Sequence, residues 1–163
     1  MALYALSYYL ELVDRTLAET GITEPPVDLM PVAGRLGLPV LGVQLPRTFR
    51  GALVYEDGMP IALVNGVLGE QAQRDTLAHL VAHVLVRLDQ PNMPYPRQDP
   101  DHRLAESMAD EFRLPQSLVK DQAGRWFNDY RYLARLFAVS EGEMLSRMRD
   151  LGLVKHSGSM WDY

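Results

Sequence analysis

The chain has 163 residues, of which 47% are hydrophobic and 23% charged, and it carries a formal net charge of −5. This size and composition predict one compact domain over residues 1–155, followed by a mobile tail over 156–163. The acidic balance argues against a protein that coats nucleic acid, and the absence of cysteine excludes disulfides and thiolate metal sites.

The apolar N-terminal stretch lacks a basic leader and is interrupted by charged residues from Glu11 onward. We therefore expect a helix of a cytoplasmic protein, without a signal peptide or a membrane span. Apolar residues at helical spacing predict this helix over 3–18, and Gly21 is its stop. A second, short helix is expected over 29–36, with Asp28 as its N-cap.

Three short strands are predicted next, over 40–43, 52–55 and 61–64. Asp57-Gly58 stands between the last two and is a strong hairpin signal, because both residues tolerate the positive φ angles of a tight turn. These segments predict an α+β fold in which a small three-stranded antiparallel sheet packs with helices.

A helix over 70–88 carries a pair of histidines, His79 and His83. Positions i and i+4 of a helix lie about 40° apart around the axis and roughly 6 Å apart along it, so both imidazoles can reach one metal ion. In the zinc-peptidase motif H-E-x-x-H the glutamate beside the first histidine is the general base. This chain has Leu80 at that position. The sequence therefore keeps the two metal-binding histidines of the motif and lacks its general base.

A proline-rich loop is expected over 90–101, followed by a helix over 101–113. This helix carries His102 and, one turn later, Glu106. Zinc accepts histidine and carboxylate ligands, so either residue is a candidate third ligand. The alternative is structural: the two histidines of the preceding helix bond backbone carbonyls in the core, and His102 lies at a helix end without a ligand role.

The C-terminal segments 133–140 and 144–153 have helix-turn-helix spacing, with Ser140 as the N-cap of the second helix and Glu143 completing a capping box. Residues 129–155 carry five basic and four acidic residues, a balance of +1. Because DNA affinity depends on many phosphate contacts, this balance favours a packing role over DNA contact.

From residue 51 to 115 the chain resembles the ImmA/IrrE family of zinc metallopeptidases. The motifs that carry the resemblance are Gly51-Ala52, Val64-Asn65 and Thr76-Leu77-Ala78-His79. The resemblance implies a zincin-like α+β fold, a zinc cofactor, and a repressor-type transcription factor as the protein that active members cleave.

The family places its third zinc ligand, a glutamate, at the start of a segment that resembles E-x-x-A-N-x-F-A-A-E-L-L-M-P. When this chain is aligned without gaps on Pro115, His102 occupies that position, whereas a shifted frame places Glu106 there. The resemblance therefore implies zinc ligands at His79, His83 and His102, with Glu106 as the alternative third ligand. It implies no catalytic residue, because Leu80 occupies the general-base position.

These observations predict a degenerate zinc peptidase domain, catalytically impaired, that acts as a regulatory or partner-binding protein linked to repressor-type transcription factors. One alternative is an active zinc metallopeptidase that cleaves a repressor, with Glu106 or another acidic group as the base. A second alternative is a regulator that binds DNA through its C-terminal helices.

Overall fold

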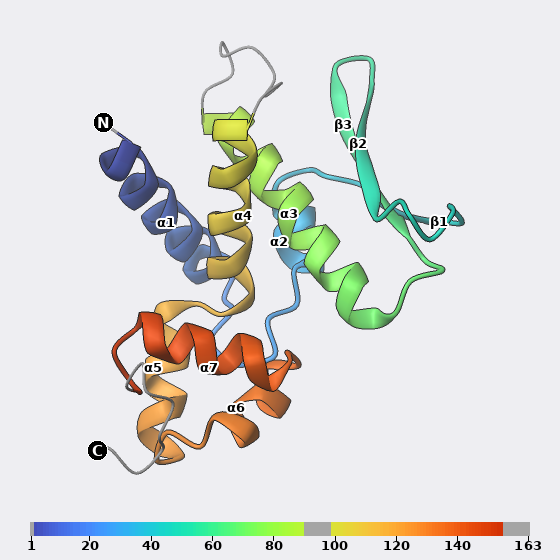
Figure 1. Ribbon diagram of the computed structural model, residues 1–163. Coiled ribbons are helices and arrows are strands. Elements are labelled where there is room, and N and C mark those ends of the chain that lie inside the picture. Colours follow the sequence, from blue (N-terminus) through green and yellow to red (C-terminus); the bar gives the residue numbers. More distant parts are fainter. Residues whose placement is uncertain (1, 90–98, 155–163) are drawn as a thin grey trace. The chain divides into compact units, whose positions relative to one another are not determined.

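The computed structural model describes residues 2–89 and 99–154 (Figure 1). They fall into two compact units: the first comprises Met1–Ile22 and Asp28–Phe112, and the second comprises Thr23–Val27 and Arg113–Tyr163. The single domain expected over 1–155 stays a prediction. The expected tail, 156–163, and most of the proline-rich loop lie outside the described residues.

The first unit begins with two helices, α1 (Ala2–Glu19) and α2 (Met30–Arg35). Helix α1 buries a stripe of side chains at helical spacing, including Tyr9, Val13 and Leu17, as expected of a helix packed on one face. Gly21, with a φ of 79°, ends this helix as predicted. The carboxylate of Asp28 accepts a hydrogen bond from the Met30 amide at 3.0 Å, although the N-cap residue is Leu29.

The sheet contains β1 (Val40–Val43), β2 (Gly51–Glu56) and β3 (Met59–Asn65) in the order β1-β3-β2. The predicted hairpin is confirmed: β2 and β3 pair antiparallel, and Asp57 and Gly58 both have positive φ angles. The prediction of a fully antiparallel sheet is wrong, because β1 pairs parallel with β3. The chain reverses direction once between β1 and β2 and again at the hairpin, so β3 runs the same way as β1.

A buried side chain, Asn65, holds the connection between β1 and β2. Its Oδ1 atom accepts hydrogen bonds from the amides of Leu45 and Val67, each at 3.1 Å. Its Nδ2 atom donates to the carbonyls of Leu45, Pro46 and Phe49 at 3.0, 3.2 and 2.8 Å. Because a buried amide must satisfy its polar atoms, these bonds define the path of the loop that leads into β2.

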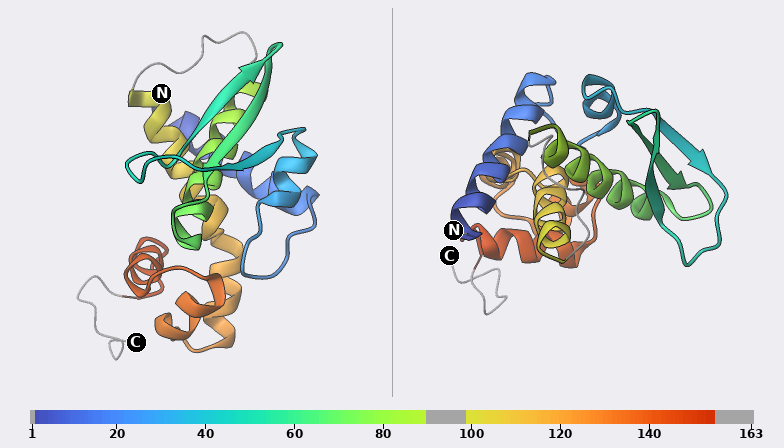
Figure 2. Two further views of the ribbon diagram at one scale, coloured as in Figure 1. Left: turned by 90° about the vertical axis from the view of Figure 1, so that its right-hand side faces the viewer. Right: turned by 90° about the horizontal axis from the view of Figure 1, so that it is seen from above.

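Helix α3 (Glu70–Asp89) packs against β3 and β2 (Figure 2). The approach is close at Gly51, where an added Cβ atom would clash with the Leu63 carbonyl and lie 2.8 Å from Cγ2 of Thr76. A glycine is therefore required at the start of β2. Helix α4 (Asp99–Arg113) follows. The α+β class predicted from the sequence is confirmed.

The second unit contains α5 (Gln116–Arg125), α6 (Tyr130–Phe137) and α7 (Glu141–Asp150). Its core is apolar, and the fully buried members include Val119, Leu133, Met144 and Met148. A turn of three residues joins α6 to α7, and Ser140 caps α7 by accepting a hydrogen bond from the Glu143 amide at 3.1 Å. The predicted helix-turn-helix arrangement of this part is confirmed.

In the described part of the chain, no helix combines the length and the apolar character that crossing a membrane requires.

Candidate metal centre

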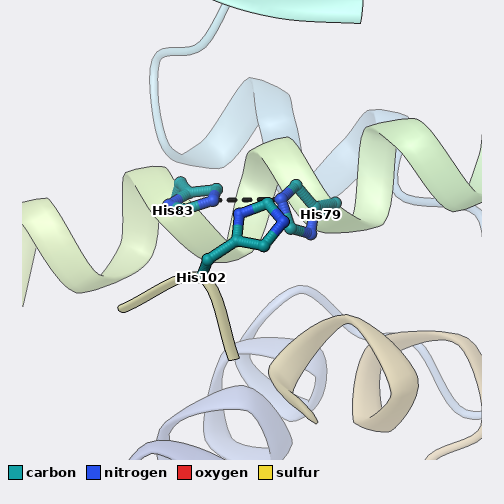
Figure 3. Close-up of side chains that lie close together, drawn as sticks. All are labelled: His79, His83 and His102. Carbon is teal, nitrogen blue, oxygen red and sulfur yellow. Dashed lines mark hydrogen bonds between the residues drawn. The ribbon is translucent and has the colours of Figure 1, made fainter. Parts of the chain in front are cut away.

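Three histidines converge from two helices of the first unit (Figure 3). His79 and His83 lie one turn apart on α3, and their Nε2 atoms are 3.0 Å apart. His102 comes from α4, and its ring centroid lies 4.5 Å from that of His79 and 5.7 Å from that of His83. The structure thus brings together the three histidines that the sequence singled out.

The spacing of the ring nitrogens suits a metal ion. Each histidine offers one ring nitrogen, and the three atoms lie within 4.8 Å of one another. A tetrahedral zinc ion with bonds of 2.0–2.1 Å separates its ligand atoms by about 3.3 Å, so small side-chain movements suffice to bind one. In addition, the Nε2 atoms of His79 and His83 face each other and not backbone carbonyls, which argues against the purely structural interpretation.

The environment keeps two of the imidazoles neutral, which is the form that binds metals. Burial, and secondarily the charge of His102, lowers the pKa of His79. Burial, followed by the charges of His79 and His102, lowers the pKa of His83 to about 4. At neutral pH, both rings therefore have a lone pair available for a metal.

The lowered pKa of His83 predicts how the metal-free protein responds to acid. In the unfolded chain this histidine takes up a proton near pH 6.5, but in the folded chain only near pH 4. The unfolded state thus binds more protons between these values, and folding stability falls as the pH drops from 6.5 toward 4. Because the ring is partly exposed, we expect a loss of about 1 kcal/mol.

Urea unfolding in the presence of a chelator, at pH 7.5 and at pH 4.5, measures this loss. His83→Gln is the matched variant, since glutamine does not titrate, and its loss of stability over the same range should be smaller. An equal loss in both proteins would assign the acid sensitivity to other groups.

Leu80 follows His79 directly but belongs to the core. Its side chain is 7% exposed, and it is one of the buried residues of α3. It has no atom that can accept a proton, so the position where zinc peptidases carry their base is apolar in this chain.

Glu106 lies beside the three histidines. It is one turn after His102 on α4, and its Oε1 atom is 3.7 Å from the Nε2 atom of His102. Both side chains are more than half exposed, at 57% for His102 and 62% for Glu106. The sequence predicts either His102 or Glu106 as the third metal ligand. Because positions i and i+4 lie on the same face of a helix, both side chains are on one face of α4.

The exposed face of α7 is not basic. Its exposed residues include Glu141, Ser146 and Asp150, while Arg147 donates a hydrogen bond from Nε to the carbonyl of Leu114 at 3.0 Å. In helix-turn-helix proteins the second helix reads the major groove. The chemistry of this helix face therefore offers few contacts to phosphates or to guanine.

No protein-family model matches the chain, and no curated protein matches it. Among solved structures, the chain is similar to a Mycobacterium tuberculosis transcriptional regulator, with a TM-score of 0.63 and 20% sequence identity. The similarity covers 88% of this chain but 46% of that chain, so this chain spans less than half the length of the regulator. The likeness shows that the two proteins share a fold.

Proposed function

We propose that this chain is a zinc-binding, catalytically impaired relative of the ImmA/IrrE peptidases that binds a repressor-type transcription factor in the cytoplasm. One observation carries the proposal: three histidines lie within metal-binding distance of one another, while the residue next to His79 is the buried Leu80. The first feature supports metal binding, and the second argues against peptide hydrolysis.

Zinc is the metal that the family resemblance implies, and the ligands are compatible with it. Neutral imidazoles suit zinc, and His79, His83 and His102 would hold it. A zinc ion with an open position lowers the pKa of bound water and polarises a carbonyl. A general base contributes about 10²- to 10⁴-fold to such a reaction, and Leu80 cannot supply it.

The choice of partner rests on the resemblance to the ImmA/IrrE family. A solved structure with the same fold is a transcriptional regulator, which is compatible with a regulatory setting but leaves the partner open. A repressor-type protein is the partner that the family resemblance implies. A module that retains the peptidase fold without the base would bind such a protein without cutting it.

The proposal predicts one zinc ion per chain and binding of a repressor without cleavage. The repressor encoded nearest to the gene of this protein is the probe. Elemental analysis measures the zinc, calorimetry the binding, and mass spectrometry the integrity of the repressor after prolonged incubation. Cleavage by the wild-type protein that disappears in His79→Ala would overturn the proposal and establish a peptidase.

The active metallopeptidase is the second candidate function, and the position of Glu106 favours it. Its carboxylate lies 3.7 Å from Nε2 of His102, beside the histidine cluster, so it is the candidate for the missing base. In that case Glu106→Gln would abolish cleavage of the repressor and leave the zinc affinity unchanged.

The DNA-binding regulator is the third candidate, and the helix-turn-helix arrangement of α6 and α7 favours it. Binding to duplex DNA that weakens steeply with salt would support it, because phosphate contacts release counterions. The acidic residues exposed on α7 lead us to expect no such binding.

A further inference from the structure

We propose that Glu106 is a fourth ligand that closes the metal site, so that the bound ion holds α3 and α4 together and has no open position for a substrate. The inference rests on the proposed binding of a metal by the three histidines. It assigns to Glu106 a role different from both a third ligand and a general base.

The two helices each contribute one pair of candidate ligands at i and i+4. Helix α3 provides His79 and His83, and helix α4 provides His102 and Glu106. Members of such a pair project from the same face of a helix, one turn apart. Because His102 lies against His79 (Figure 3), the face of α4 that carries Glu106 is turned toward the histidines of α3.

Within each helix, the two candidate ligand atoms are spaced like neighbouring ligands of one ion. Ligand atoms around a tetrahedral zinc ion are about 3.3 Å apart. The Nε2 atoms of His79 and His83 are 3.0 Å apart, and Oε1 of Glu106 is 3.7 Å from Nε2 of His102. Across the two helices, the group of atoms within 4.8 Å of one another comprises the three histidine nitrogens, so the Glu106 carboxylate has to turn toward them to bind. The Glu106 carboxylate also acts on His79, where its charge opposes the effect of burial, so it influences ligands on both helices.

Glu106 is free to turn onto a metal ion. Its side chain is 62% exposed, and an exposed contact with a histidine one turn away contributes little to stability. Exchanging that contact for a metal bond therefore costs little. A carboxylate also offsets part of the charge of a divalent cation, which three neutral imidazoles do not.

A closed site has a different chemistry from an open one. Structural zinc sites have four protein ligands, whereas catalytic sites keep one position for water. With Glu106 bound, no metal-bound water remains to attack a peptide, which is a reason for inactivity independent of Leu80. The ion would instead connect the two helices that flank residues 90–98.

The full-length protein loaded with Co²⁺ in place of zinc tests the inference, because the visible spectrum of Co²⁺ reports coordination number. We expect the wild-type spectrum to be that of a four-coordinate ion and to be unchanged by azide. In Glu106→Gln the affinity for Co²⁺, measured by competition with a chelator, should fall by roughly 100-fold, and azide should then alter the spectrum.

The matched control is Glu70→Gln, an exposed glutamate about 13 Å along α3 from His79, which should change neither the affinity nor the spectrum. Circular dichroism of the metal-free variants checks that each is folded.

The outcomes separate this inference from the proposed function. If Glu106→Gln binds Co²⁺ as tightly as the wild type, and azide enters the wild-type site, the inference is overturned while metal binding by the histidines stands. If the wild-type protein binds neither Co²⁺ nor zinc, both proposals are overturned. If only the variant with glutamine admits azide, the fourth ligand is established.

Discussion

Replacing His83 with alanine is expected to weaken zinc binding by roughly 100- to 1000-fold, because structural zinc sites gain about 10–16 kcal/mol from only a few ligands. Burial lowers the pKa of His83 to about 4, so its ring is neutral at pH 7, and its Nε2 atom lies 3.0 Å from that of His79. In the described part of the chain, the other two imidazoles already belong to the same cluster, so none is left to replace it. Competition titration against a chelator of known affinity measures the loss.

The remaining histidine of the sequence, His156, provides the control for this measurement. His156→Ala should leave the zinc affinity unchanged, since the metal is assigned to the other three histidines. Zinc binding at wild-type strength in His83→Ala would contradict the assignment of the site to α3 and α4.

Replacing Leu80 with glutamate is expected to lower the free energy of unfolding by about 3–5 kcal/mol. Burial of a leucine side chain contributes roughly 1.5–3 kcal/mol, and a carboxylate placed in apolar surroundings adds a desolvation cost. Leu80 is 7% exposed, so both losses apply. Urea unfolding at neutral pH, with and without zinc, measures the change.

Leu88→Glu on the same helix is the matched control. Leu88 is 54% exposed, so this substitution makes the same chemical change on the surface and should alter stability by less than about 0.5 kcal/mol. If Leu80→Glu were as stable as the wild type, the side chain at position 80 would face solvent and not the core.

The same variant tests whether the missing glutamate limits peptide hydrolysis. The sequence alone suggests that glutamate at position 80 restores some cleavage of a repressor, because it rebuilds the H-E-x-x-H pattern. The buried position of Leu80 adds a condition, which is that enough of the protein must stay folded. Cleavage is therefore to be compared per folded molecule, and a gain over the wild type would support descent from an active peptidase.

The local elements were predictable because their signals lie within a few residues. The periodicity of apolar residues identified α3 to within one residue of its observed end at Asp89. The Asp57-Gly58 dipeptide identified the hairpin, since its two positive φ angles are a local requirement. Ser140 is likewise predictable as the N-cap of α7, because a cap depends on one side chain and the amides of the next three residues.

The parallel pairing of β1 with β3 was not predictable in this way. The residue pattern of a strand does not reveal which strand it pairs with. Here β3 occupies the middle of the sheet, so β1 pairs with β3 and not with β2. Asn65 contributes to that pairing through its hydrogen bonds to the β1–β2 connection. Those bonds join residues that are 16 to 20 positions apart in the chain.

The sequence by itself determined the helical spacing of His79 and His83 and the absence of a base at position 80, because both depend only on residue order and helix geometry. Only the tertiary structure decided that His102 joins them, that Leu80 is buried, and that Glu106 lies beside the cluster. The first and the third depend on where α4 lies beside the histidines of α3, and the second depends on what covers α3. Such packing is set by side chains distant in the sequence, and no local pattern specifies it.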